Sequence, residues 1–336
     1  MKVDESTMQA IYATAHGDTG MLKIQKTLKP LVKSGEALVR LKAAGINFID
    51  IYMRQGSSAI RVPIPFIPGV EGSGIVEEVF NDVTVVKPGD RVAFVGHLGT
   101  YAEYITVQAS QLIPLRENMT FYEGAAFPLQ GMTAQYLVNE LYPVKPGDHV
   151  LVHAAAGGVG LLTVQWLKHL GAHVIGTVST REKAKIARIA GVDDVIIYTE
   201  EDFVTETKRL TNGKGVDYII DGVGKSTFAK NLEAVRTRGC ICFFGFSSGI
   251  PDSVDMIKLQ MKSITLCGGG LMNYLSSREE LLKRANQVVE GVTEGWLKLN
   301  VSHVFTLDQA PEAQRLLETR QTTGKLLLTI GEGNHG

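Results

Sequence analysis

Three features of the sequence predict an α/β protein with two domains, one β-rich and one built on a doubly wound parallel sheet. The chain has 336 residues, which is roughly the length of two domains. Short strand patterns follow one another up to about residue 128, whereas beyond Pro128 strands of about five residues alternate with helices. Where the first strand of this second part meets its helix, residues 148–171 read DHVLVHAAAGGVGLLTVQWLKHLG, which resembles a dinucleotide-binding turn.

The first part is expected to form a partly closed β-barrel. Its strand patterns are separated by turns at Gly17–Gly20 and Lys33–Gly35, and residues 47–54 predict a short helix. A glycine-dense stretch at 68–80 predicts a close backbone approach followed by a strand. The expected strands lie in MQAIYAT, MLKIQKTL, EALVRLKAAG, PGVEGSGIVEEVF, KPGDRVAFVG and TYAEYITV.

The second part predicts a parallel sheet whose strands are apolar because helices cover both faces. After the strand at 149–153, a helix begins near Val159 and ends at Gly171. Helices are also expected at 181–190, before 216, and at 225–236. The remaining expected strands are HVIGT, DVIIY, VDYIID, CICFFG and SITLCG.

The end of the chain returns to the first domain. Residues 273–330 predict a helix at 278–290, a strand pair and a helix from Ala310, and then a last strand, KLLLTI. Placing that strand in the first domain's sheet makes the first domain discontinuous. The expected domains are therefore 1–128 with 273–336, and 129–272.

Composition excludes several classes of protein. The chain is 44% hydrophobic and 21% charged with a formal net charge of −1 and no block of basic residues, so nucleic-acid binding is not expected as its main role. No apolar run reaches the roughly 20 residues of a membrane span, and MKVDESTMQA lacks the apolar core of a secretory signal. Cys240, Cys242 and Cys267 lie in apolar strand patterns and are expected to be buried reduced thiols, as in a cytoplasmic protein.

The turn at 155–160 places small residues at the three positions of the dinucleotide fingerprint, with alanine for the first glycine. Ala155 makes the tight turn, Gly157 lets the backbone approach a pyrophosphate, and Gly160 lets the helix pack on the strand. Free N–H groups and the positive dipole at the helix start then hold phosphates. The alternative is a tight strand–helix turn that binds no ligand.

The second strand indicates NADPH rather than NADH. A site for NADH has an acidic residue roughly 20 residues after the first glycine, but no acid occurs from His173 to Thr180. Ser179, Lys183 and Tyr198 instead offer hydroxyls and a cation to a 2′-phosphate. Alternatively, Lys183 is a solvated helix residue and Ser179 a turn residue. Residues 221–224 and 244–247 end two further strands and are expected to line the same crevice.

Seven stretches make the chain resemble the zinc-free quinone oxidoreductase (zeta-crystallin-like) branch of the medium-chain dehydrogenase/reductase superfamily. They are GINFIDIYMRQG, PGVEGSGIV, GDRV, QGMTAQYL, HAAAGGVG, IGTVST and TGKLLL. The resemblance spans roughly residues 8–330. It implies a GroES-like catalytic domain, a Rossmann domain inserted in it, and a homodimer joined through edge strands of the two Rossmann sheets.

The same comparison argues against a metal. The zinc branch has cysteine where this chain has Asn47 and histidine where it has Val70, although the following acid is present as Glu71. Neither replacement is a good zinc ligand, and the four-cysteine zinc lobe is absent from the sequence. We therefore expect no bound metal, and a hydrogen-bonded structural role for Glu71.

The resemblance also implies the site residues. Asn47 and Tyr52 are the expected catalytic residues, facing nicotinamide and substrate, and Thr133 contacts the nicotinamide ring. Residues 269–271 and Lys325 are expected to line the far side of the cofactor. The expected cofactor-binding set is Asn47, Tyr52, Gln130, Thr133, Ala156, Gly157, Gly158, Val159, Gly160, Ser179, Lys183, Tyr198, Val223, Phe244, Gly245, Phe246, Ser247, Gly269, Gly270, Leu271 and Lys325. Many relatives have an aromatic residue at the substrate mouth where this chain has Ser57-Ser58-Ala59, which predicts a wider or more mobile mouth.

Without zinc or an evident acid, an ordinary ketone is a poor hydride acceptor because its alkoxide needs stabilisation. A quinone suits such a site because its reduced anion is delocalised, and the predicted activity is an NADPH:quinone oxidoreductase. Asn47 and Tyr52 are expected to donate hydrogen bonds to the quinone, unless they are only a helix N-cap and a core tyrosine. His97 is expected to be a loop histidine. Two alternatives remain: an NADPH-dependent enone or alkenal reductase, and a non-catalytic NADPH-binding or RNA-binding protein.

Overall fold

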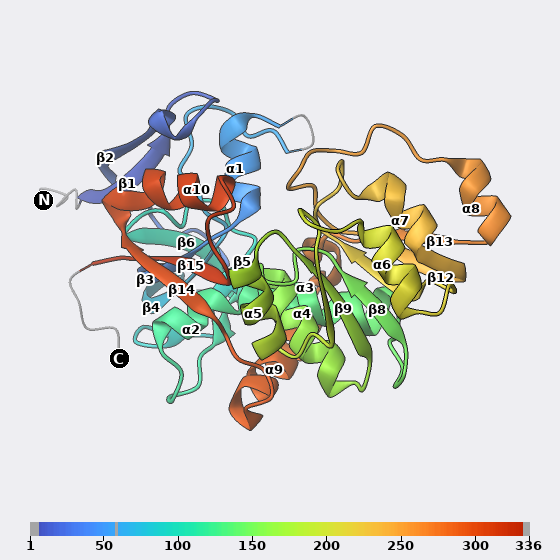
Figure 1. The fold of residues 1–336 in the computed structure, drawn as a ribbon. Helices are drawn as coiled ribbons and strands as arrows, with labels where there is room; N and C mark the ends of the chain where they lie inside the picture. Colours follow the sequence, from blue (N-terminus) through green and yellow to red (C-terminus); the bar gives the residue numbers. More distant parts are fainter. Residues whose placement is uncertain (1–6, 58–59, 332–336) are drawn as a thin grey trace, which may run out of the picture. The chain divides into compact units, whose positions relative to one another are not determined.

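A computed structural model describes residues 7–57 and 60–331 of the chain (Figure 1). The chain forms two compact units. The first comprises Met1–Leu129, Ser277–Ala285 and Val301–Gly336, and the second comprises Gln130–Ser276 and Asn286–Asn300. Helices α3 (Pro128–Tyr136) and α9 (Arg278–Glu294) continue from one unit into the other along the chain.

The first unit is built on a mainly antiparallel sheet, in which one pair of strands, β14 and β15, is parallel. Its strands are β1 (Thr7–Ala13), β2 (Leu22–Leu28), β3 (Glu36–Ile46), β4 (Glu71–Val79), β5 (Arg91–Val95), β6 (Tyr104–Gln108), β7 (Ile113–Pro114), β14 (Val301–Thr306) and β15 (Lys325–Thr329). β1 and β2 pair with each other, and the larger sheet has the order β14-β15-β3-β4-β5-β7, with β6 also paired to β3. The last strand thus pairs with β3, which confirms its expected return.

Three helices accompany this sheet: α1 (Phe48–Gln55), α2 (Phe121–Ala126) and α10 (Ala310–Glu318). Gly56 follows α1 as its C-cap, and its φ of 70° lies in the left-handed region. α1 lies beside α10 (Figure 1), and Arg54 of α1 is wholly buried between Gln314 Oε1 at 2.7 Å and Glu318 Oε2 at 2.6 Å. Because an unpaired buried guanidinium is costly, these contacts fix α1 against α10.

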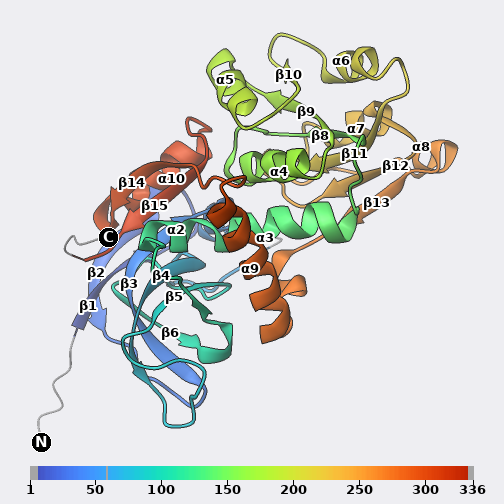
Figure 2. The same ribbon diagram turned by 90° about the horizontal axis from the view of Figure 1, so that it is seen from below.

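The second unit confirms the doubly wound parallel sheet. Its strand order is β10-β9-β8-β11-β12-β13, with every neighbouring pair parallel. The helices pack around these strands (Figure 2). The elements are β8 (His149–Val152), α4 (Gly158–His169), β9 (His173–Val178), α5 (Arg181–Ile189), β10 (Asp194–Ile197), α6 (Phe203–Leu210), β11 (Val216–Asp221), α7 (Phe228–Ala234), β12 (Val235–Phe243), α8 (Met256–Lys262) and β13 (Thr265–Gly268).

Two local expectations are wrong. The helix expected over 225–236 is α7 alone, because Val235 already pairs with Val216 at the start of β12. The expected strand pair after α9 is the single strand β14. The residues between α9 and β14 contact α4 and do not form a second strand. The Lys298 N–H donates to Gln165 Oε1 at 2.8 Å, and the Trp296 ring packs on Trp166.

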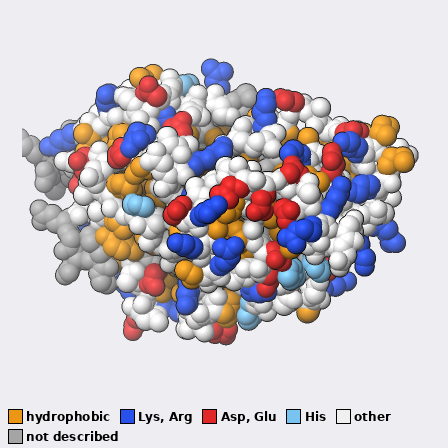
Figure 3. Space-filling model, in the orientation of Figure 1, with side chains coloured by type: hydrophobic (Ala, Val, Ile, Leu, Met, Phe, Trp, Pro, Cys, Tyr) orange, Lys and Arg blue, Asp and Glu red, His pale blue; other side chains and the backbone are white. Residues whose placement is uncertain are grey.

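Charges are well mixed on the surface. On the face shown in Figure 3, basic and acidic side chains are interspersed, without a continuous basic area. Among the described residues, no helix is both long enough and apolar enough to cross a membrane. The three cysteines are free thiols, and Cys240 and Cys242 are buried as expected. The expectation is wrong for Cys267, which is only half-buried because it lies on the edge strand β13.

Candidate functional site

In the turn between β8 and α4, two glycines have no room for a side chain. A Cβ on Gly160 would overlap the carbonyl oxygen of Ala154, and one on Gly158 would overlap the carboxamide of Gln130. A Cβ on Gly157 would lie 3.2 Å from the same carbonyl of Ala154, which is tight but open on its other side. Gly157 is the N-cap of α4, and no side chain caps the helix there. The first N–H groups of α4 therefore suit a phosphate, so this turn fits a dinucleotide.

Ser179 and Tyr198, two of the residues expected at the 2′-phosphate, are brought together by the sheet. They follow β9 and β10, which are neighbours, and Tyr198 N–H donates to the carbonyl of Val178 at 3.1 Å. Thr199 Oγ1 donates to the carbonyl of Ser179 at 2.9 Å. Lys183 lies in the first turn of α5, half-buried, and its N–H donates to Thr180 Oγ1 at 3.2 Å. The nearby exposed Arg181 is bound to Glu200, so it is not free to replace Lys183.

A buried carboxylate, Asp221, organises the loop that ends β11. Its Oδ1 accepts hydrogen bonds from the N–H groups of Val223 (2.7 Å) and Gly224 (3.1 Å). Its Oδ2 accepts from Thr227 Oγ1 and from Asn231 Nδ2 at 2.6 Å. Four bonds to a wholly buried acid make this loop a fixed part of the crevice.

His153 extends this network to β9. Because Asn231 Nδ2 donates to Asp221, its Oδ1 faces His153 Nε2 at 2.8 Å and must accept a proton from it. His153 Nδ1 forms a hydrogen bond with Thr177 Oγ1 at 3.0 Å. The network joins the loop after β11 to the end of β9, the strand that Ser179 follows.

The loops after β12 and β13 complete this half of the site. The loop at 244–248 is tied to the β11 loop, since Ser248 N–H donates to the carbonyl of Val223 at 2.8 Å and Ser247 N–H to that of Gly222 at 3.2 Å. In the loop at 269–271, Tyr136 Oη donates to the carbonyl of Gly269 at 3.0 Å. Gln130 and Thr133 lie nearly buried on α3.

The first unit holds the other expected residues around a buried ion pair. Lys325 Nζ contacts Glu71 Oε1 and donates to Asn47 Oδ1 at 2.9 Å, while Asn47 Nδ2 donates to Glu71 Oε1 at 2.7 Å. Glu71 Oε2 also accepts the N–H of Leu129 at 2.8 Å. A Cβ at Gly45 would overlap the Glu71 carboxylate, so glycine is required to make room for it. The expected structural role of Glu71 agrees with these contacts.

Asp50 lies at the start of α1, wholly buried. Its Oδ2 accepts from the N–H of Asn47 and from Tyr101 Oη, both at 2.9 Å. Burial raises the pKa of Asp50 to about 7, against the opposing hydrogen bonds and the nearby Lys325 ammonium. Burial also holds the pKa of Tyr101 well above its ordinary value. Sequence inspection missed Asp50 and Tyr101, because an acid in a first helical turn ordinarily indicates only a cap.

These side chains do not fit a catalytic zinc. Zinc in such a site takes three or more thiolate, imidazole or carboxylate ligands. Here Asn47 is an amide bound at both ends, Val70 is apolar, and Glu71 is already neutralised by an ammonium. Among the residues that the structure describes, no three His, Cys, Asp or Glu side chains are grouped to hold a metal.

The expected residues thus fall into two sets. Asn47, Tyr52 and Lys325 lie in the first unit, and all the others lie in the second. Tyr52 is half-buried on α1, with its ring centroid 6.2 Å from that of Phe48. His97 lies in the turn after β5, where it contacts Gln111 and where burial lowers its pKa. Ser58 and Ala59 of the expected substrate mouth lie outside the described residues.

Comparison with known proteins gives consistent matches along the whole chain. The family model described as zinc-binding dehydrogenase matches residues 158–287, and that of the alcohol dehydrogenase GroES-like domain matches residues 33–117. Quinone oxidoreductase 1 of Escherichia coli (strain K12) is 38% identical over 320 residues, covering 93% of this chain and 97% of the relative. A 2-haloacrylate reductase of a Burkholderia species is also 38% identical, over 304 residues, with 88% and 90% covered.

Solved structures of quinone oxidoreductases have the same fold as this chain. The E. coli quinone oxidoreductase in complex with NADPH superposes with a TM-score of 0.93 at 37% identity, covering 96% of this chain and all of that one. The Pseudomonas syringae pv. tomato DC3000 quinone oxidoreductase gives 0.92 at 37% identity, with 96% and 99% covered.

Proposed function

Because the chain belongs to the quinone oxidoreductases of the medium-chain dehydrogenase/reductase superfamily, we propose that it reduces quinones with NADPH. The overall reaction is quinone plus NADPH and a proton, giving hydroquinone and NADP⁺. NADPH, when bound, supplies the hydride. The observation that carries the proposal is the turn at Gly157–Gly160, where Gly158 and Gly160 have no room for a Cβ, at the start of α4, which no side chain caps.

The second unit supplies the residues that hold the cofactor. The N–H groups at the start of α4 bind the pyrophosphate, and Ser179, Lys183 and Tyr198 bind the 2′-phosphate. The Asp221 network fixes the loop of Val223 before any ligand arrives, so little ordering free energy is needed on binding. The loops at 244–247 and 269–271 hold the rest of the cofactor.

The first unit supplies the polar groups for the acceptor. Lys325 and Glu71 neutralise each other and each binds Asn47, which fixes the Asn47 carboxamide in place. Tyr52 and Asn47 orient the acceptor oxygen. No zinc is required, since a quinone delocalises the charge it gains. Purified protein with NADPH and 1,4-benzoquinone tests the proposal: NADPH oxidation should match hydroquinone formation one to one.

A second candidate is the reduction of conjugated enones or alkenals. The relative named 2-haloacrylate reductase, 38% identical to this chain, favours it. An enone accepts hydride at its β-carbon and, like a quinone, spreads the resulting charge. Turnover of enones without quinones would make this the function, and NADPH binding without turnover of either would indicate a non-catalytic protein.

We further propose a homodimer joined through β13. This strand ends the parallel sheet, and the neighbouring α8 exposes Met256, Ile257 and Met261, each at least 66% accessible. An unpaired strand edge beside exposed apolar side chains suits a second copy of the sheet. We also propose a cytoplasmic location, because the three cysteines are free thiols and form no disulfide bond with one another. Light scattering on the purified protein tests the dimer, and Ile257→Glu should yield monomers.

A further inference from the structure

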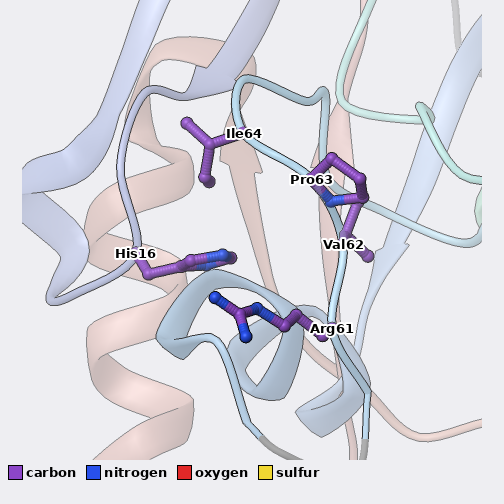
Figure 4. A pocket seen from close by; sticks show the side chains of 5 residues that line it. All are labelled: His16, Arg61, Val62, Pro63 and Ile64. Carbon is purple, nitrogen blue, oxygen red and sulfur yellow. The ribbon is translucent and has the colours of Figure 1, made fainter.

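The first unit contains a cavity of about 510 Å³ that the proposed chemistry does not use (Figure 4). Its lining is His16, which follows β1, and Arg61, Val62, Pro63 and Ile64, which follow α1. This volume is in the range of small-molecule sites. The lining combines three apolar side chains with a guanidinium and an imidazole, and contains no carboxylate.

The cavity is positively charged. Arg61 is exposed, and Figure 4 shows its guanidinium turned towards the His16 ring. No carboxylate of the described residues pairs with it. His16 Nδ1 is buried and has no hydrogen-bond partner within the described part of the chain. A guanidinium is always charged, so an anion here meets a cation that no carboxylate among residues 7–57 and 60–331 already neutralises.

Neighbouring charges do not cancel that of Arg61. Glu318 is held by Arg54 at 2.6 Å and by Gln55 at 2.5 Å. Asp18, near His16 in the chain, accepts the N–H of Gly20 at 2.8 Å. The C-terminal end of α1 opposes an anion through its carbonyls. Two of these carbonyls, those of Tyr52 and Met53, already accept the N–H groups of Ser57 and Gly56, at 2.9 and 3.1 Å.

The cavity lies close to the proposed acceptor site. The His16 ring packs on Gly56, where an added Cβ would come within 2.7 Å of its Cγ. Gly56 is the left-handed C-cap that follows α1, and the N–H of the next residue, Ser57, donates to the carbonyl of Tyr52 at 2.9 Å, so the cavity adjoins the end of the helix that carries Tyr52.

We propose that the His16–Arg61 cavity is a subsite for a negatively charged substituent, a carboxylate or sulfonate, on the conjugated acceptor. The guanidinium pairs with the anion, and Val62, Pro63 and Ile64 cover the apolar stem that carries it. The protein therefore prefers anionic quinones and enones to neutral ones of equal reactivity. This inference rests on the proposed function, and it names the substrate class.

Two acceptors and three variants test it. Initial rates are measured for 1,2-naphthoquinone and 1,2-naphthoquinone-4-sulfonate with the wild type, Arg61→Gln and Arg61→Lys, and with Lys26→Gln as a control. Lys26 is an exposed residue of β2 in the same unit, so its loss changes net charge equally. Comparing each variant with the wild type on one acceptor cancels the intrinsic reactivity of the two quinones.

Arg61→Gln should raise KM for the sulfonate roughly tenfold and change KM for the neutral quinone less than twofold, with kcat preserved, since a charge-assisted contact is lost. Arg61→Lys should recover part of the loss, and Lys26→Gln should resemble the wild type. Equal changes with both quinones, or a Lys26→Gln effect as large as that of Arg61→Gln, would overturn the subsite. Neutral-quinone turnover reports on the proposed function separately.

If neither quinone is turned over, calorimetry still decides the subsite. 2-Naphthalenesulfonate should bind the wild type roughly tenfold more tightly than Arg61→Gln. Equal binding would reject the subsite without reference to catalysis.

Discussion

Lys325 and Glu71, 254 residues apart in the chain, form an ion pair whose side chains are 2% and 0% exposed. The pair joins β15 to β4 across β3, and Asn47 bridges the two charges. Asn47 stands where the zinc-dependent branch has a cysteine. A buried ammonium with a fixed carboxamide is thus the polar centre of the first unit.

Lys325→Met should lower the free energy of unfolding by about 3–5 kcal/mol, because it leaves the Glu71 carboxylate buried without a countercharge. Urea unfolding of the variant measures this loss. Lys325→Met combined with Glu71→Gln should recover most of it, since neither charge is then buried alone. A double variant as unstable as the single one would show that the pair is not the cause.

Asp50 makes stability depend on pH in an unusual direction. Its folded pKa of about 7 exceeds its ordinary value, so the native state binds the proton more tightly. Its contribution to stability is full below about pH 4 and falls until about pH 7. Relative to Asp50→Asn, the wild type should lose about 2–3 kcal/mol of unfolding free energy between pH 5 and pH 8. Parallel pH profiles of the two proteins would contradict the raised pKa.

Lys183→Ala should weaken NADPH binding selectively. The wild type should bind NADPH at least about tenfold more tightly than NADH, corresponding to roughly 1.4 kcal/mol or more for the 2′-phosphate contacts. Fluorescence titration of both cofactors measures the ratio. Lys185→Ala, an exposed lysine on the same helix, is the matched control and should keep it. Equal wild-type affinities for NADH and NADPH would reject the assignment.

Gly157→Val should fold and yet fail to bind NADPH. Its Cβ meets the Ala154 carbonyl at 3.2 Å, a distance that a small shift relieves, while the rest of the side chain takes the space of the pyrophosphate. Circular dichroism and cofactor titration separate the two effects. Gly160→Val provides the contrast, because its clash with a backbone carbonyl should lower the melting temperature itself.

Local patterns predicted most of the fold. The apolar strands of the second part indicated a parallel sheet, and the apolar strand KLLLTI was correctly expected to return to the first unit, as β15 shows. Helices α2 and α8 were missed because each is short. A capping box, Thr120 with Glu123, was an available signal for α2.

The long-range parts of the site could not be predicted. Nothing in sequence spacing links Lys325 to Glu71, and only the pairing of β15 and β4 with β3 brings them together. Asp221 and Asn231 belong to a strand and the following helix, and their contact depends on packing. The resemblance nevertheless named Asn47 and Lys325, which are in direct contact.

The central claim is that the protein reduces acceptors that are electron-poor by themselves, without a metal. Its most direct test is the initial rate of NADPH oxidation, after exhaustive chelation, with 1,4-benzoquinone, cyclohex-2-enone and cyclohexanone. We predict full turnover of the quinone and little or none of the saturated ketone, since no group here stabilises an alkoxide strongly. Loss of activity on chelation, or reduction of cyclohexanone as fast as benzoquinone, would contradict the account.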